Sequence, residues 1–468
     1  MTTFTKSRHS LINTRYKSNY TFLDQESCKL RFASVFFKIV LLFNLTAWST
    51  NVMSSGYTVN FEESYGKGKS PSTTSIISSP DGGYAFTGTW LSTSGSWIVK
   101  TDKKGQQQWE QSFQTSTDTW WERASVVAPT KDGGYLIGGQ TDALDLVSSQ
   151  WDDSHGHSRR PIAAYAAKID KNGQVIWRKI FGKLGNYSMN NIFRVFAVDD
   201  GFIFLGQTPT VVTGQMSIDG KSLDNTVTIG TLWLFKINLS GEILWDKTLP
   251  KDGDEYLNPS LTGTDYSKLL VDQDRNIVFA TAITEIHSDI IDGKKLLDWR
   301  GRSNIIPKKM LVIKLDMNGN ELKRTRLPFG VDPTLIATSN GYRLLSNQVA
   351  VNPQETHIVG LQSVNLDADL NIASQQLIPS KSFWIHSAIA GPNGGLHLAG
   401  YHRTPPNDRG EAAIAFLSKE GEIRDEKLLG INSWTADLTE GASLDEAVFL
   451  WWGSWHEKAF LTKFKLTE

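Results

Sequence analysis

Cysteine is almost absent from this chain of 468 residues, which has Cys28 alone. A single thiol excludes a disulfide framework and any zinc or iron–sulfur site built from several cysteines. The sequence also lacks a Gly-x-x-x-x-Gly-Lys phosphate loop and a Gly-x-Ser-x-Gly nucleophile elbow, so neither motif indicates phosphate binding or serine hydrolysis. No apolar run after residue 49 is long enough to cross a bilayer, and we expect no membrane span in the mature chain.

Charge of one sign is scarce too, since the formal net charge is -1. Residues 1–49 hold seven Lys or Arg and two Asp or Glu, a balance of +5, which leaves -6 for the rest. A nucleic-acid partner needs a basic stripe, so the mildly acidic body argues against one. Apolar and aromatic side chains are present in strength, at 40% and 11% of all residues, which is enough for a large core and excludes wholesale disorder.

The first 49 residues are arranged like a secretory signal. A basic segment precedes a short apolar run over residues 39–48, and Ala47 and Ser49 place small residues at its exit. This order predicts a signal peptide over residues 1–49, and therefore an exported protein that is periplasmic, on the cell surface or secreted. Two alternatives stay open: the segment is an uncleaved anchor, or translation starts at Met53 and removes it.

One pattern recurs along the body of the chain. In its clearest copies an Asp-Gly-Gly turn leads into an apolar stretch, a variable loop, a Lys-x-Asp-x-x-Gly turn and a Trp. The glycines that close the second turn are Gly105, Gly173, Gly241 and Gly319, which are 68, 68 and 78 residues apart. Gly421 lies 102 residues further on, or two steps of 51. A basal period near 50 with insertions is typical of propeller blades.

Each copy is predicted to form four short strands. Glycine permits the positive φ of the tight turns, the second strand is expected to alternate between apolar and polar residues, and the fourth carries Trp109, Trp177 or Trp245 as a structural residue. Residues 446–452 and 458–464 give a seventh copy without an outer strand, and residues 57–66 resemble the outer strand of the first copy. We therefore expect an all-β, seven-bladed β-propeller of four-stranded blades over 56–468, closed by its N-terminal strand so that no sheet edge stays open.

The Asp-Gly-Gly-Tyr turns, followed by Lys-Ile-Asp-x-x-Gly-x-x-x-Trp, resemble quinoprotein-type (PQQ-like) β-propeller repeats, and most of all secreted proteins built from such blades. The resemblance covers residues 56–468 and implies the fold. It does not imply one activity, because such propellers include scaffolds, adhesins and enzymes. Quinoprotein dehydrogenases of this type usually have eight blades, a vicinal cysteine pair and a calcium site, so seven copies and one cysteine argue against PQQ as a cofactor.

Function is expected where the repeats vary. The two kinds of turn should share one end of the strands, the turn face, and the loops between strands two and three should share the other end, the loop face. The insertions at residues 142–161, 209–229 and 285–307 fall on the loop face of adjacent blades two, three and four. Loops on a rigid scaffold commonly form binding surfaces, so we predict that these insertions form one side of a cleft.

The blade-two insertion contains most of the chemistry. It holds Asp152, Asp153, His155, His157 and Arg159. The histidines with a carboxylate could ligate zinc or another divalent ion. A histidine base beside arginine could instead deprotonate an acidic sugar. A solvated polar loop without either role is the third interpretation.

Further candidates stand where innermost strands begin. Arg123 and Tyr187 join the catalytic candidates His155, His157 and Arg159. Aromatic rings beside amides and carboxylates suit sugar binding, although propeller aromatics mostly pack between blades. The predicted ligand-binding residues are Trp121, Glu122, Asn190, Asn191, Tyr266, Trp384 and His386. Asp170–Gly173 and Asp316–Gly319 resemble the start of a calcium loop but lack its later bidentate acid, and the same residues make ordinary hairpin turns.

Three functions follow from these patterns. The first is an exported, monomeric propeller that binds a glycan or a surface protein without chemistry. The second is a lyase or hydrolase that degrades an extracellular polysaccharide on the same face. The third is a scaffold for an envelope assembly. No cofactor is required by any of them, and a divalent calcium or zinc ion stays an open alternative.

Overall fold

The computed structural model of the protein describes the chain from residue 56 to residue 467, with gaps, and the statements below concern those residues. The described ranges are 56–66, 69–91, 95–113, 122–142, 162–182, 190–218, 221–249, 251–252, 255–256, 269–286, 290–291, 294–295, 305–328, 330–351, 356–380, 382–404, 407–431, 433–453 and 458–467. The predicted signal peptide and Cys28 lie outside them.

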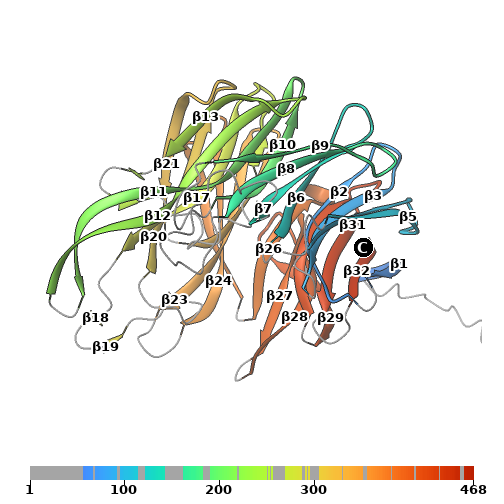
Figure 1. Ribbon diagram of the computed structural model, residues 1–468. Coiled ribbons are helices and arrows are strands. Elements are labelled where there is room, and N and C mark those ends of the chain that lie inside the picture. The colour runs from blue at the N-terminus through green and yellow to red at the C-terminus, as the bar shows by residue number, and fades with distance from the viewer. Residues whose placement is uncertain are drawn as a thin grey trace, which may run out of the picture. The chain divides into compact units, whose positions relative to one another are not determined.

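Seven antiparallel sheets follow one another along the chain as the blades (Figure 1). Six of them have four strands, and the sheet of blade four has six, because β14 and β15 extend it. The strands of blades one to three are β2 (Pro71–Ser78), β3 (Tyr84–Trp90), β4 (Gly95–Thr101), β5 (Gln107–Phe113); β6 (Glu122–Pro129), β7 (Tyr135–Thr141), β8 (Ala163–Ile169), β9 (Val175–Phe181); and β10 (Asn191–Val198), β11 (Gly201–Ile218), β12 (Lys221–Asn238), β13 (Ile243–Leu249). Those of blades four and five are β16 (Leu269–Val271), β17 (Ile277–Ile286), β20 (Ile305–Leu315), β21 (Glu321–Leu327); and β22 (Val331–Thr338), β23 (Gly341–Val351), β24 (Thr356–Asp367), β25 (Ile372–Pro379).

The last two blades complete the count. Their strands are β26 (Phe383–Ala390), β27 (Leu396–Thr404), β28 (Asn407–Leu417), β29 (Ile423–Ile431); and β30 (Ser433–Glu440), β31 (Glu446–Gly453), β32 (Lys458–Thr467), β1 (Gly56–Tyr65). Short strand pairs decorate blade four: β14 (Lys251–Asp252), β15 (Glu255–Tyr256), β18 (Ile290–Ile291) and β19 (Lys294–Lys295). A 3-10 turn, η4, spans Pro392–Gly394.

The innermost strands close a ring. In the order β2, β6, β10, β16, β22, β26, β30 each contacts the next, and β30 returns to β2. The N-terminal strand β1 pairs with β32 from Gly56↔Thr467 to Tyr65↔Ala459, so it supplies the outer strand of blade seven. In Figure 1 the blue β1 lies beside the red β32. The predicted seven-bladed propeller and its closure by the N-terminal strand are confirmed.

The core is divided into seven apolar clusters, one between each pair of neighbouring blades. In β11, Phe202 and Phe204 join the cluster shared with blade two, while Ile203 and Leu205 join the one shared with blade four. Both faces of such a strand are therefore covered. This corrects the expected alternation of the second strand: all seven residues of β3 are buried, because each sheet packs between two others.

Blade three departs most from the repeat on the loop face. β11 and β12 pair without interruption out to Ile218↔Lys221, with 18 residues in each strand. The corresponding strands of blade one have seven residues each. At about 3.3 Å per residue the extra length projects about 35 Å, and Figure 1 shows the pair running far past its neighbours. The insertion at 209–229 is thus largely an extended hairpin.

Among the described residues, none of the helical segments is both long and apolar enough to span a membrane.

Candidate functional site

The repeated motif is explained by contacts within each blade. Asp132 of the Asp-Gly-Gly turn pairs with Lys168 of the Lys-x-Asp segment at 2.7 Å. The hydrogen bonds from Lys168 and Thr130 lower the pKa of Asp132 to about 2. Gly133 has φ 79°, and a Cβ on Gly134 would lie 2.2 Å from the Ile169 carbonyl oxygen. The same kind of ion pair recurs as Lys100–Asp81 and Lys236–Asp200, and in blade four Lys314 pairs with Asp272, which occupies the turn position of Thr130.

The carboxylates of the second turn are used in the same structural way. Asp170 Oδ1 accepts the backbone N–H groups of Asn172 and Gln174, both at 2.8 Å. Asp316 Oδ1 accepts those of Asn318 and Asn320 at 2.9 and 2.8 Å. These hydrogen bonds define an Asx turn. In both segments that resemble a calcium loop, the first carboxylate therefore stabilises the turn.

Three predicted ligand-binding residues are buried in the structure. Trp384 is 1% exposed and donates its Nε1 hydrogen to Asp332 Oδ2 at 2.7 Å. His386 is 7% exposed, and its carbonyl accepts the Thr334 hydroxyl. Glu122 is fully buried and pairs with Arg178 at 2.8 Å. Their positions at the starts of inner strands were predicted correctly, but in the structure they join neighbouring strands and blades rather than lie open to a ligand.

The two asparagines of blade three differ. Asn190 is fully buried, accepts the Thr208 hydroxyl at 2.8 Å and donates to the Ile162 carbonyl at 3.1 Å. Asn191 is partly exposed, and its Oδ1 has no hydrogen-bond partner among the described residues. Gln207 stands opposite Asn191 in the sheet, and its Oε1 likewise lacks a described partner. Both oxygens are themselves buried, so the structure does not present either of them to a ligand.

Most of the predicted loop-face chemistry lies outside the described residues. Arg123 is described and is exposed on β6. The candidates outside the described ranges are Trp121, Asp152, Asp153, His155, His157, Arg159, Tyr187 and Tyr266. Their catalytic, metal-binding and sugar-binding roles stay predictions. In the part of the chain that the structure describes, no group of three or more His, Cys, Asp or Glu side chains is placed to hold a metal ion.

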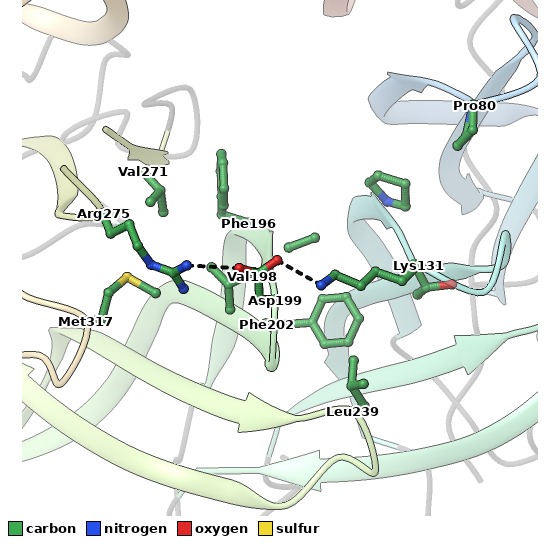
Figure 2. Close-up of a pocket in the computed structure, with 13 residues that line it drawn as sticks. Pro80, Lys131, Phe196, Val198, Asp199, Phe202, Leu239, Val271, Arg275 and Met317 are labelled. Carbon is green, nitrogen blue, oxygen red and sulfur yellow. Dashed lines mark hydrogen bonds and ion pairs between the residues drawn. The ribbon is translucent and has the colours of Figure 1, made fainter. Parts of the chain in front are cut away.

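A pocket of about 410 Å³ opens on the turn face of blades one to four. Its apolar lining comes from inner strands and turns of several blades, and Figure 2 shows these side chains around one space. The apolar residues are Pro80, Pro129, Phe196, Ala197, Val198, Phe202, Leu239, Val271 and Met317. Sequence reasoning missed this site because it assigned function to the loop face.

A chain of charges crosses the pocket (Figure 2). Lys131 Nζ lies 2.8 Å from Asp199 Oδ1, and Arg275 Nη1 lies 2.9 Å from Asp199 Oδ2. The three residues come from the first turns of blades two, three and four. Hydrogen bonds from Lys131 and Arg275 lower the pKa of Asp199, so this carboxylate stays ionised and the group carries a net charge of +1.

Arg275 stands in an unusual backbone position. Its N–H bonds the Asp272 carbonyl at 3.0 Å, as the Gly133 N–H bonds the Thr130 carbonyl in blade two. Its φ is 61°, against 79° for Gly133. The left-handed region is costly for a residue with a side chain. An arginine where other copies have glycine was the signal in the sequence that could have revealed this site.

No family model and no curated protein matches this chain. Among solved structures it is similar to a protein of unknown function from Dyadobacter fermentans, with 8% identity, TM-score 0.43, and coverage of 88% of this chain and 100% of that one. It is also similar to the Dos1 propeller, with 9% identity, TM-score 0.42, and 88% and 97% coverage. A protein of unknown function from Bacteroides caccae has 14% identity, TM-score 0.37, and 75% and 96% coverage.

Proposed function

We propose that this chain is an exported β-propeller that binds a glycan or a surface protein through the loop face of blades two to four, without catalysing a reaction. One observation carries the proposal: β11 and β12 extend far beyond the length that the blade needs. Blade one is complete with seven-residue strands at the same positions. A rigid ring with a long projecting hairpin is the usual way to present a recognition surface.

One further point supports the location. Blades two and four, whose sequences carry the other two insertions, are the neighbours of blade three in the ring, because β6, β10 and β16 contact one another in that order. Export and the PQQ-like repeat type belong to the proposal, and they rest on the sequence patterns alone.

The test removes the projecting hairpin. The intact protein is first tested for binding to a panel of acidic and neutral polysaccharides and purified surface proteins. Deleting residues 211–228 and joining the shortened strands with Asn-Gly should abolish binding to each member of the panel that the intact protein binds. The melting temperature should stay within a few degrees, because the deleted residues lie beyond the length of the regular blade. Shortening the β27–β28 hairpin of blade six in the same way is the matched control and should leave binding unchanged.

The same samples decide the alternatives. Size-exclusion profiles of each polysaccharide before and after incubation reveal chain shortening, which would replace the binding function by a lyase or hydrolase activity. Full binding after the deletion would contradict the proposed surface. Recovery with an envelope assembly, and no binding to any isolated member of the panel, would favour a scaffold.

A further inference from the structure

The turn-face pocket is separate from the surface that the proposed function uses. The blades are antiparallel, so the turns that line the pocket lie at the opposite end of the strands from the β11–β12 hairpin. The turns that line the pocket are also held by hydrogen bonds from neighbouring blades. Leu239 and Met317 belong to second turns whose carbonyls accept the Nε1 hydrogens of Trp177 and Trp245, at 3.3 and 2.9 Å. Its walls are therefore fixed by packing between blades.

The pocket exposes apolar surface that the fold itself does not need to expose. Leu239 is 41% exposed, and Phe196 and Val198 are only partly buried although both are on an innermost strand. Phe202 closes the floor at 1% exposure. An apolar hollow of this kind, bordered by polar groups, is typical of a recognition site.

The charged rim contributes little to folding. The side chains of Lys131, Asp199 and Arg275 are 63%, 64% and 59% exposed, and exposed ion pairs stabilise a fold only slightly. Arg275 moreover occupies a left-handed turn position that glycine would fill without strain. Backbone strain of this kind clusters at functional sites. The charges of the rim are therefore accessible to a ligand and are not needed for the fold.

We propose that this pocket binds a peptide segment that has a large apolar side chain next to an Asp or Glu. The apolar side chain is buried against Phe196 and Leu239, and the carboxylate is held by the Arg275 guanidinium, whose fork matches a carboxylate. The net charge of +1 at the rim suits one or two carboxylates and is too small for a polyanion such as nucleic acid. The open rim, which spans three blades, suits an extended chain.

The test uses a displayed library of random decapeptides, selected in parallel on the wild-type protein and on variants. The wild-type should enrich peptides with an acidic residue within three positions of Phe, Leu, Ile or Trp. Arg275→Gly should weaken binding of the enriched peptide about tenfold, the loss in affinity that is expected when one charged hydrogen-bonding partner is removed. This variant suits the turn, so its melting temperature should stay close to that of the wild-type. Leu239→Glu, which places a negative charge in the apolar part, should also lose binding.

Two controls make the result decisive. Lys103→Ala removes an exposed cation from the turn face of blade one and should bind like the wild-type. The loop-face hairpin deletion should keep peptide binding, so the failure of one proposal is independent of the other. Selection without the acidic–apolar motif, or equal affinity of the enriched peptide for wild-type, Arg275→Gly and Leu239→Glu, would overturn the proposal.

Discussion

The hydrogen bonds of the buried His397 side chain depend on its protonation state. His397 is fully buried, and its Nε2 lies 2.7 Å from the Leu444 carbonyl, so Nε2 must donate. Its Nδ1 lies 2.5 Å from the Tyr57 hydroxyl and must accept. A proton on Nδ1 would reverse this bond, so that the Tyr57 hydroxyl accepts it and directs its own hydrogen to the Ala415 carbonyl at 3.2 Å. Burial lowers the pKa of His397, against the opposing effect of the Leu444 hydrogen bond and of Asp445.

We therefore expect stability to fall as the pH drops below about 6.5, the ordinary histidine pKa. In that range the unfolded chain binds a proton that folded His397 does not, so the contribution is complete above pH 6.5 and is lost toward the lowered folded pKa. Urea unfolding at pH 7.5 and pH 5.5 measures it. Asp445 lies beside His397, and the Ser443 hydrogen bond lowers its pKa, so it stays ionised over this range and is present in every variant.

The decrease in unfolding free energy from pH 7.5 to pH 5.5 should be smaller in His397→Gln than in the wild-type, because the neutral amide does not titrate. His402→Gln is the matched control. His402 is partly exposed and pairs with Glu426 at 2.7 Å, so this variant should keep the acid loss that His397 causes. An unchanged pH dependence in His397→Gln would show that another group is responsible.

At the scale of the element, the outer strand of one blade is fastened to the second turn of the next. Trp109, Trp177 and Trp245 donate to the carbonyls of Lys171, Leu239 and Met317. Each indole also covers the turn glycine of that next blade, where a Cβ on Gly241 would lie 3.0 Å from the Trp177 ring. The Trp at a fixed place in the repeat is therefore structural, as predicted, because its partner recurs one repeat later.

Two glycine substitutions distinguish the cost of the turn conformation from the cost of disturbing the indole contact. Gly82 and Gly241 have nearly the same φ, 79° and 81°, but a Cβ on Gly82 meets nothing within 4 Å. Gly82→Ala should cost about 1 kcal/mol from backbone conformation alone. Gly241→Ala should cost more, because the methyl group must displace Trp177. Urea unfolding of both variants measures the difference, and equal losses would mean that the indole gives way freely.

At the scale of the molecule, ring closure depends on β1. Tyr57 and Tyr65 are buried in the clusters on the two sides of blade seven. The Tyr65 hydroxyl donates to the Gly105 carbonyl of blade one at 2.5 Å. Trp109 makes the equivalent bond at the next junction, between blades one and two. The strand therefore fills the outer edge of its own blade and also ties it to the first.

Removal of residues 1–65 should lower the unfolding free energy by several kcal/mol, since each large apolar side chain contributes about 2 kcal/mol by burial and the edge of β32 is left open. A chain that begins at Met53 should keep the stability of the full chain. A synthetic peptide of residues 56–66, added in excess, should restore the melting temperature of the truncated protein by mass action. A truncated protein as stable as the full chain would show that β1 is dispensable.

The candidate sites were less predictable than the fold. Glu122 and Trp384 were placed correctly at the starts of inner strands, yet burial and their partners Arg178 and Asp332 come from residues 56 and 52 positions away. The pocket was not predicted at all: Lys131 and Asp199 are ordinary turn residues when each is considered alone, and Arg275 at a glycine position does not by itself show which residues it meets. Sequence spacing does not show which turns meet around a ring.

The sequence by itself determined the seven blades, the two kinds of turn and the N-terminal closing strand, because each depends on a short run of residues that repeats: glycine for a positive φ, Asp for an Asx turn, Trp at a fixed offset. Only the tertiary structure decided that the middle strands are buried on both faces, that Tyr57 donates to His397 across 340 positions, and that three turns form one charged pocket. These features arise between blades, where packing of distant segments sets the burial and the charge that each side chain experiences.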